Sequence, residues 1–421
     1  MTAPSGFSAP ARRTVTALLL AFAVAHGLYQ IGRAFLHPKQ GLDLAPAYLA
    51  GRMAREGSRA FYDDPTVGKL GTALGIHGPD GAGAPVLNFI YPPWVPAVYA
   101  PVSFLPWDAA RRAWLVLSFL CFVTALLAAI QAAVPEARRK AATMPVLAAA
   151  CFFFPFFYGL MTGQANDLLL LLVAGALLLL VRRQPLLAGA ILAPAILWKP
   201  FLAAVVPFLV LRREWKALAG LAVGGVSLVA LSVPVGSEGG WTDWLRQISQ
   251  HNALTAAEPR NHSLAAAVLS FGLPPAWILP VTRVLQGLAI VAAGALILPK
   301  TRPGETRYAL QFGGSLVAAL LLTPKAWEHY GVFLLPAFIA ATALAIEEES
   351  PPLWPALLGA SFAVWGLMLQ GRDEYRALAD VGLAFLAPAK SGAAVVLLLV
   401  AVRLVWKRRA HSAGTVARPS R

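Results

Sequence analysis

Long apolar runs without a charged side chain recur along this chain, and they constrain its fold more than any other feature. A helix of about 20 residues crosses the roughly 30 Å core of a bilayer, and helices satisfy their own backbone groups in lipid. The runs without Asp, Glu, Lys or Arg cover 14–32, 113–134, 141–166, 217–237 and 350–371. Further apolar segments cover 85–106, 168–181, 184–211, 277–298, 308–323, 329–346 and 381–402. We therefore predict an all-α polytopic membrane protein with about 10 to 13 spans.

The net charge of +15 would suggest a nucleic-acid partner if its placement were ignored. Hydrophobic residues make up 58% of the chain and charged residues 13%, and the basic residues cluster at the ends of the predicted spans. These clusters are Arg12-Arg13, Arg111-Arg112, Arg138-Arg139-Lys140, Arg182-Arg183, Arg212-Arg213 and Lys407-Arg408-Arg409. Positive-inside bias explains this pattern better, so we expect membrane lipids and no nucleic acid as partners.

One membrane domain, 1–421, accounts for the whole chain, because no linker separates a second folded unit. The first apolar run lacks a clear cleavage site, and we interpret it as a retained helix. With both termini on the cytoplasmic side, 33–84 is the first external loop and 238–263 the second. Trp241 and Trp244 in the second loop are interpreted as part of the aromatic belt at the membrane interface.

The topology between residues 85 and 236 is ambiguous, because the basic clusters on both sides of 113–134 cannot both be cytoplasmic. We favour a solution in which the proline-rich 85–106 is a re-entrant or broken element. In this solution 163–167 is external, and 184–211 forms two half-spans that meet near Lys199-Pro200.

Asp43 stands in the first external loop, directly after the first apolar run. Small residues follow it at helical spacing as far as Gly57, which predicts a short interfacial helix over 44–56. Asp43 then has two interpretations: a general base, or only the N-cap of that helix. The glycine-rich 71–85 that follows is predicted to be a flexible loop able to act as a lid.

Other polar side chains interrupt apolar sequence, where an ionisable group costs about 2.5 to 3.5 kcal/mol. Lys199 is expected to be a cation facing a cavity, although an ordinary short loop between two spans is the alternative. Gln164 and Asn166 either form a simple polar turn or line a site that binds hydroxyl groups.

Lys325 and His329 lie at the start of an apolar helix, where free N–H groups and the helix dipole favour phosphate. An exposed N-terminal turn is the alternative. Arg260 and His262 precede another apolar segment and suit an anionic ligand as well as they suit an ordinary loop. No Cys or His spacing predicts a metal site or a disulfide, and we expect no cofactor.

These residues together resemble the GT-C type glycosyltransferases, specifically glycosyltransferase family 87, the polyprenyl-phosphate-mannose-dependent alpha-(1→2)-mannosyltransferase-like group. The resemblance covers nearly the whole chain and rests on the order of several short motifs. The motifs are Asp43-Leu-Ala-Pro-Ala-Tyr48-Leu-Ala-Gly51, Phe61-Tyr62-Asp63, Tyr91-Pro92-Pro93, Gly163-Gln164-Ala165-Asn166, Lys199-Pro200, Asn261-His262-Ser263-Leu264 and Pro324-Lys-Ala-Trp327-Glu-His329.

The resemblance implies a GT-C type bundle with external juxtamembrane helices and inverting transfer of a sugar from a polyprenyl-phosphate carrier to a glycolipid or glycan acceptor. The sugar would be mannose, and the site would face the outside of a bacterial inner membrane. Asp43 would be the general base. The donor phosphate would be held by Lys199, Arg260, His262, Lys325 and His329, and the sugar or acceptor by Tyr48, Gln164, Asn166 and Asn261.

Two departures from the family pattern concern the donor sugar and the acceptor more than the reaction class. This chain has His329-Tyr330 where the family often has two histidines, and Asn261-His262-Ser263 where it often has Asn-Gln-Ser. The alternative function is a transporter or flippase of lipid-linked saccharides, which would also need cations within the membrane. A binding or scaffold protein without catalytic activity is the third possibility.

Overall fold

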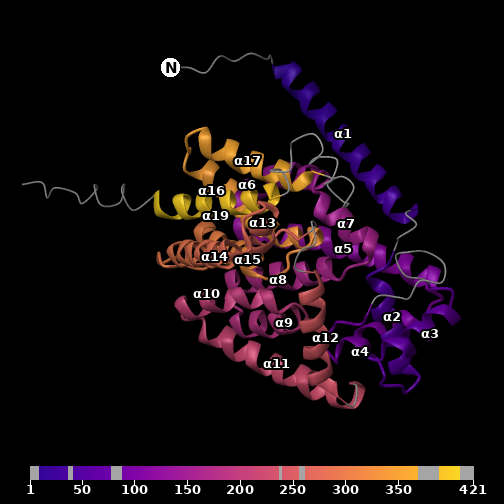
Figure 1. Cartoon of the computed structure of the whole chain (residues 1–421). Helices are drawn as coiled ribbons and strands as arrows, with labels where there is room; N and C mark the ends of the chain where they lie inside the picture. Colours follow the sequence, from indigo (N-terminus) through magenta and orange to yellow (C-terminus); the bar gives the residue numbers. More distant parts are fainter. Residues whose placement is uncertain are drawn as a thin grey trace, which may run out of the picture.

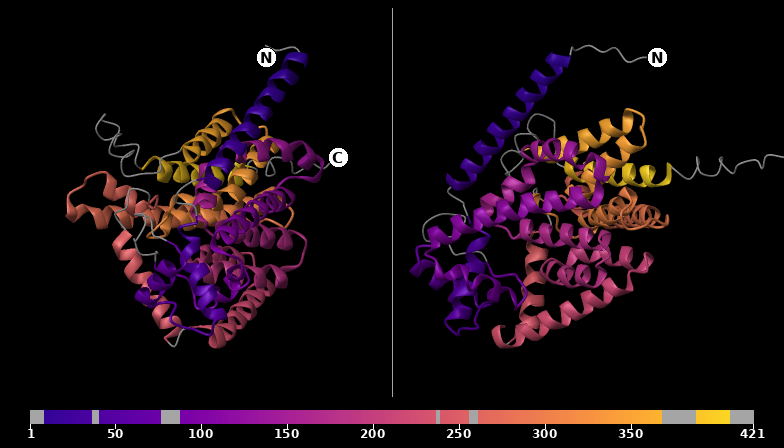
Figure 2. Two further views of the ribbon diagram at one scale, coloured as in Figure 1. Left: turned by 90° about the vertical axis from the view of Figure 1, so that its right-hand side faces the viewer. Right: turned by 180° about the vertical axis from the view of Figure 1, so that it is seen from behind.

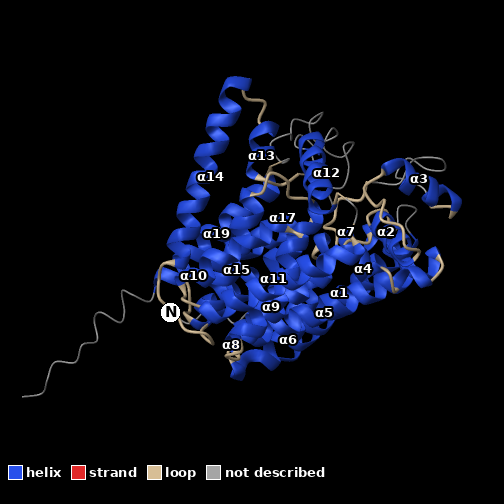
Figure 3. Ribbon diagram, turned by 90° about the horizontal axis from the view of Figure 1, so that it is seen from below, coloured by secondary structure: helices blue, strands red, loops and turns tan. Residues whose placement is uncertain are grey.

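The structure is a computed structural model, and it describes residues 9–36, 41–76, 88–236, 239–255, 261–367 and 388–407. Element labels follow Figure 1, and Figure 3 shows helices and no strand over these residues. The helices are α1 (Ala9–Leu36), α2 (Leu44–Arg55), α3 (Asp64–Ala73), α4 (Val95–Tyr99), η1 (Val102–Phe104), α5 (Trp107–Ala133), α6 (Glu136–Ala150), α7 (Phe154–Thr162), α8 (Asn166–Val181), α9 (Pro185–Trp198), η2 (Pro200–Val205), α10 (Val206–Leu211), α11 (Trp215–Val235), α12 (Gly240–Thr255), α13 (Leu264–Ser270), α14 (Pro275–Ile297), α15 (Thr306–Leu322), η3 (Glu328–Leu334), α16 (Leu335–Glu347), α17 (Leu353–Gly366) and α19 (Ala389–Lys407).

Helices of membrane length confirm the predicted all-α polytopic membrane protein. Within the described residues, six helical segments are long and apolar enough to cross a bilayer, and a bent pair adds a seventh. Four shorter apolar helical segments accompany them. Large apolar side chains on α11 and α14 face outward, including Val226 at 70% exposure and Val291 at 68%. Such apolar outer surfaces suit lipid and not water.

The first helix is mostly exposed, although it contacts α6 and α7. Only 17% of its apolar window is buried, and the N-terminal part of α1 extends beyond the other helices in Figures 1 and 2. Its C-terminal end leads to α2, α3 and α4, which gather at one end of the bundle (Figure 1). The C-terminal end of α19 points toward the opposite end.

The two predicted interruptions of the apolar sequence are present. Residues 88–106 contain only the short helices α4 and η1, so this region is broken and is not a full crossing. α9 ends at Trp198 and η2 begins at Pro200, so the two half-helices meet at Lys199 as predicted. A third interruption was not predicted: the run 141–166 is divided into α6 and α7, which meet at 60°. Pro155 at the start of α7 explains this break, because proline is accommodated in a first helical turn and not in a helix interior.

The two loops predicted to be external contain more helix than the sequence predicted. The short helix expected after Asp43 is α2, and Gly51 allows it to approach the backbone of Tyr99 so closely that a Cβ would overlap. Part of the expected lid, 71–73, belongs to α3, while 77–85 lies outside the described residues. Most of 238–263 is the helix α12. The belt interpretation of Trp244 is wrong, since this side chain is buried and donates to the carbonyl oxygen of Ile90 at 3.1 Å.

Close helix packing holds the first half of α9 against α11. α9 and α11 lie together along their lengths, and a Cβ at Gly189 or Gly220 would overlap the backbone of the facing helix. Small residues at such crossings allow helices in lipid to approach closely, where dispersion contacts supply the stability. The N-terminal half of α9 is therefore held by glycine-mediated contacts.

Candidate functional site

The turn that carries Asp43 is joined to the end of α7 by backbone hydrogen bonds. The N–H of Gly41 donates to the Met161 carbonyl oxygen at 3.0 Å, and the N–H of Asp43 donates to the Thr162 carbonyl oxygen at 2.8 Å. Gly163 follows with φ +76°, and a Cβ there would crowd Leu44. Position 163 therefore requires glycine, both for its positive φ and because a side chain would collide with Leu44. This explains the first residue of the Gly163-Gln164 motif.

The side chain of Asp43 does not cap α2. Its backbone lies at φ −84° and ψ −18°, and its carboxylate makes no cap hydrogen bond, whereas an N-cap residue is normally extended and accepts from the first turn. The carboxylate interacts instead with the side chains of Thr162 and Gln164 and remains half-buried. The capping interpretation is therefore not supported by the geometry.

Lys199 reaches the same cluster from the junction of α9 and η2. Its side chain is buried, its Nζ donates to Gln164 Oε1 at 3.4 Å, and the Nζ lies 4.0 Å from the centroid of the Tyr330 ring. Gln164 thus lies between the carboxylate of Asp43 and the ammonium of Lys199. A cation held over an aromatic face at this depth is a positioned group and not a loop residue in solvent.

Lys325 adds a second buried cation from the segment before η3. Its Nζ lies 4.4 Å from the centroid of the Trp327 ring, and its side chain is 5% exposed. Burial raises the pKa of the Asp43 carboxyl above its ordinary value, while hydrogen bonds with Gln164 and Thr162 and the charges of Lys199 and Lys325 oppose that rise. The site thus combines one carboxylate with two cations.

His329 and Asn166 form a neighbouring contact. Asn166 donates its side-chain N–H to the His329 carbonyl oxygen at 2.8 Å, which ties the start of α8 to η3. The His329 ring is stacked on Tyr158, with centroids 5.9 Å apart, and is 4% exposed. The oxygen of the same side-chain amide, Asn166 Oδ1, is buried without a hydrogen-bond partner in the structure.

Asn261 and His262 hold the segment before η3 in place. The Asn261 amide donates to the Pro324 carbonyl oxygen at 3.0 Å and its Oδ1 accepts from the Ala326 N–H at 2.8 Å. His262 is buried, with Nε2 at 2.9 Å from Glu328 Oε2. Burial lowers the pKa of His262, and the neighbouring Glu328 carboxylate opposes this. Both side chains are used inside the fold, and Arg260 lies outside the described residues.

Tyr48, expected to bind the sugar or the acceptor, lies in the core. Its side chain is 2% exposed, and its hydroxyl donates to the Leu105 carbonyl oxygen at 2.9 Å. Its ring packs edge-on against Trp107 at 5.2 Å between centroids. The hydrogen-bonding capacity that a sugar would need is already used to join α2 to the end of η1.

Sequence reasoning missed three residues that surround Asp43. Thr162 contributes its side chain, Tyr91 donates its hydroxyl to the Asp43 carbonyl oxygen at 3.4 Å, and Tyr330 lies beneath Lys199. Tyr91 begins the motif Tyr91-Pro92-Pro93 and Tyr330 directly follows the motif that ends at His329, so their places in or beside these motifs were the available signal. Over the described residues, no group of three or more His, Cys, Asp and Glu side chains is placed to hold a metal ion.

Comparisons with known proteins show what this chain is similar to. The model of glycosyltransferase family 87 matches residues 89–324, more than half of the chain. A "Polyprenol-phosphate-mannose-dependent alpha-(1-2)-phosphatidylinositol mannoside mannosyltransferase" of Mycolicibacterium smegmatis (strain ATCC 700084 / mc(2)155) is 26% identical over 300 residues, which is 66% of this chain and 67% of the relative. No solved structure matches. The chain therefore belongs to glycosyltransferase family 87.

Proposed function

We propose that this protein transfers a hexose, mannose, from a polyprenyl-phosphate carrier to a glycolipid or glycan acceptor with inversion. The observation that carries the proposal is the convergence of Asp43 with Lys199 and Lys325 from three distant segments. The carrier and the sugar are those in the name of the mycobacterial relative, which also names a phosphatidylinositol mannoside. A carboxylate beside buried cations suits a reaction in which a hydroxyl loses a proton and a phosphate departs.

In the proposed step, the acceptor oxygen attacks the anomeric carbon of the donor and forms the new glycosidic bond. The bond from the anomeric carbon to the phosphate oxygen breaks, and its electron pair leaves with the polyprenyl phosphate. Asp43 accepts the proton of the attacking hydroxyl. The leaving group is already an anion, so cations stabilise it and a second carboxylic acid is unnecessary.

Lys199 and Lys325 are the best-supported donors to the departing phosphate, since both are buried cations close enough to Asp43 to lower the pKa of its carboxyl. His329 is retained beside them because Asn166 fixes its backbone next to the cluster. Gln164 and Asn166 remain proposed hydroxyl-binding groups. The hydrogen bonds that Tyr48, Asn261 and His262 make within the fold support structural contacts for these three instead of ligand binding.

We propose that the site lies on the external side of a bacterial inner membrane, because the basic clusters near both ends of the chain favour cytoplasmic termini. Exposed positions allow a direct test in a variant whose two native cysteines are replaced by Ala. Lys69→Cys on α3 should react with a membrane-impermeant thiol reagent added to intact cells. Arg138→Cys at the start of α6 should react only after the membrane is opened. The reverse labelling pattern would overturn the orientation.

The reaction itself is tested with purified protein in lipid nanodiscs, supplied with polyprenyl-phosphate-mannose or with a nucleotide-linked mannose. Transfer to a phosphatidylinositol mannoside acceptor is expected only from the polyprenyl donor, and Asp43→Asn is expected to abolish it. In vesicles, movement of the carrier between leaflets without any transfer would support the flippase alternative instead. Transfer from the nucleotide sugar would refute the proposed donor class.

A further inference from the structure

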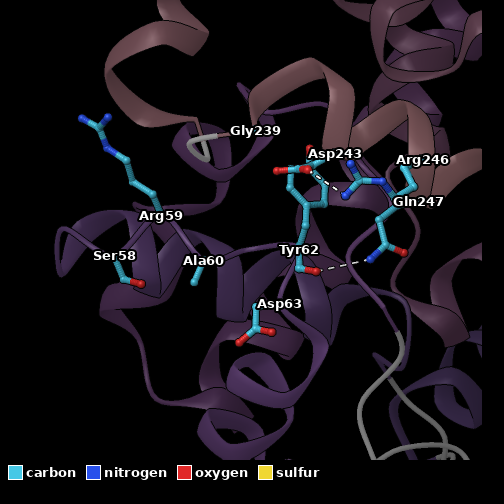
Figure 4. A pocket seen from close by; sticks show the side chains of 9 residues that line it. All are labelled: Ser58, Arg59, Ala60, Tyr62, Asp63, Gly239, Asp243, Arg246 and Gln247. Carbon is cyan, nitrogen blue, oxygen red and sulfur yellow. Dashed lines mark hydrogen bonds and ion pairs between the residues drawn. The ribbon is translucent and has the colours of Figure 1, made fainter.

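A cavity of about 490 Å³ opens between the segment 58–63 and the N-terminal half of α12 (Figure 4). α12 contributes Asp243, Arg246 and Gln247, and these side chains lie on the same side as Tyr62. The other segment contributes Arg59, Tyr62 and Asp63. None of these side chains belongs to the cluster around Asp43 described above.

The charged side chains that line this cavity are balanced in sign. Asp243 Oδ1 and Arg246 Nη1 are 3.2 Å apart, and the Gln247 side-chain N–H donates to the Tyr62 carbonyl oxygen at 3.3 Å. Carboxylates and guanidinium groups have several hydrogen-bonding positions each, so these contacts leave capacity for a ligand. Asp243 and Arg246 together offer one carboxylate and one guanidinium group, and this balance favours a neutral ligand rich in hydroxyls over a phosphate, which would need an excess of cations.

Two successive hydrogen bonds link the lining of the cavity to the main chain of the candidate base. The Tyr62 hydroxyl donates to the Tyr91 carbonyl oxygen at 2.7 Å, and the Tyr91 hydroxyl donates to the Asp43 carbonyl oxygen at 3.4 Å. Trp244, on α12, donates to the Ile90 carbonyl oxygen at 3.1 Å. Residues 90–91 are thus held between the cavity and Asp43. A ligand in the cavity lies next to the segment that contacts the base.

We propose that this cavity binds the saccharide part of the acceptor, as neutral hexose rings, and directs its free hydroxyl toward Asp43. The inference rests on the proposed function and adds the location of the acceptor. Arg246, Asp243 and Tyr62 supply hydrogen bonds and an aromatic surface, while the donor phosphate is held by separate cations.

The test measures binding of a soluble α-linked mannose disaccharide to the full chain in nanodiscs by saturation-transfer NMR. Asp243→Asn and Arg246→Ala should each weaken binding by about tenfold or more, because each removes a charged partner of a sugar hydroxyl. Asp108→Asn is the matched control, since Asp108 also pairs with an arginine three residues later in the first turn of a helix, with Asp108 Oδ1 and Arg111 Nη2 2.7 Å apart. Asp43→Asn should still bind the disaccharide.

Equal binding by all variants, or no binding by the wild-type chain, would overturn the inference. Competition by inorganic phosphate at millimolar concentration would also overturn it, because the cavity would then be an anion site. Transfer from polyprenyl-phosphate-mannose is measured on the same samples. If the wild-type chain transfers mannose but the Asp243 and Arg246 variants still bind the disaccharide normally, only the acceptor site is refuted. If the wild-type chain binds the disaccharide but transfers no mannose, the proposed function is refuted.

Discussion

The backbone N–H of Asp43 donates to the carbonyl oxygen of Thr162 at 2.8 Å, so the position of the candidate base is fixed by its main chain. The side chain can therefore be changed without releasing the turn. Two cations and two neutral polar side chains surround the carboxylate, and they come from segments far apart in the sequence. This arrangement separates the chemical role of the carboxylate from the stability of the loop.

Asp43→Asn should lower the transfer rate by about 10²-fold or more, because an amide cannot accept the acceptor proton. The variant should keep the wild-type fold, and its folded state should be as stable as the wild type or slightly more stable. Burial raises the pKa of this carboxyl in the folded chain, so its ionised form costs stability at neutral pH, and the amide removes that cost. Initial rates and melting temperature in detergent measure the two effects. A near wild-type rate would show that Asp43 is not the base.

The rate should fall at low pH as Asp43 becomes protonated, since only the carboxylate accepts a proton. Its raised pKa places this loss above the ordinary value of 3.8. Gln164→Ala removes a hydrogen bond that lowers the pKa, so the acid limb of kcat/KM should move to higher pH. The pH profile of the purified variant measures the shift. Movement to lower pH would contradict the proposed contact.

Lys325→Ala should weaken use of the donor, because a buried cation near the departing phosphate would be lost. A charge-assisted hydrogen bond contributes about 1.5 to 3 kcal/mol, so kcat/KM for the polyprenyl donor should fall by about tenfold to 150-fold. Lys300→Ala is the control, since Lys300 is exposed. Steady-state kinetics with varied donor measure the effect. Equal values for the two variants would remove Lys325 from the phosphate site.

Local sequence patterns predicted most of the transmembrane framework. Charge-free runs located the long helices, and the Lys199-Pro200 pair located the break, because lipid imposes helical structure and proline interrupts it. α12 was read as an interfacial loop although Trp241, Trp244 and Ile248 have helical spacing. The polar residues between these apolar positions led to the interpretation as a loop, although the helical periodicity was present.

The partners of the site residues could not be predicted in the same way. Glu328 pairs with Lys390 from a distant helix, and Tyr91 reaches Asp43 from a segment without regular periodicity. Such contacts depend on how helices pack in three dimensions, and a single sequence records only which residue types are available. For the same reason His262 was expected at the donor phosphate, whereas its ring contacts Glu328.

Glu328 joins His262 and Lys390 in a buried charged cluster, with its carboxylate oxygens 2.9 Å from Nε2 and 2.6 Å from Nζ. Lys390→Met should lower the free energy of unfolding by about 3 to 5 kcal/mol, because the buried Glu328 carboxylate loses its lysine partner. Arg52→Met is the control, since its partner Glu56 is largely exposed and the loss should be about 1 kcal/mol or less. Denaturation monitored by tryptophan fluorescence compares them. Similar losses would show that the buried cluster adds no special stability.

Gly220 and Gly225 lie on the same helix, α11, but differ in their surroundings. A Cβ on Gly220 would overlap the backbone of Leu186 on α9, whereas a Cβ on Gly225 meets nothing within 4 Å. Gly220→Ala should therefore separate the helices and destabilise the protein by about 1 to 3 kcal/mol. Gly225→Ala should be neutral or stabilising by up to about 1 kcal/mol, since alanine favours helix more than glycine does.

Because α9 ends at Trp198, directly before Lys199, the separation of these helices should also reach the site. Gly220→Ala should reduce transfer activity at temperatures where the protein remains folded, and Gly225→Ala should leave it unchanged. Melting temperature and initial rate, measured on both variants in the same detergent, test the two effects together. Opposite signs of the stability change are the expected result, and equal changes would mean that the close crossing of α9 and α11 does not position Lys199.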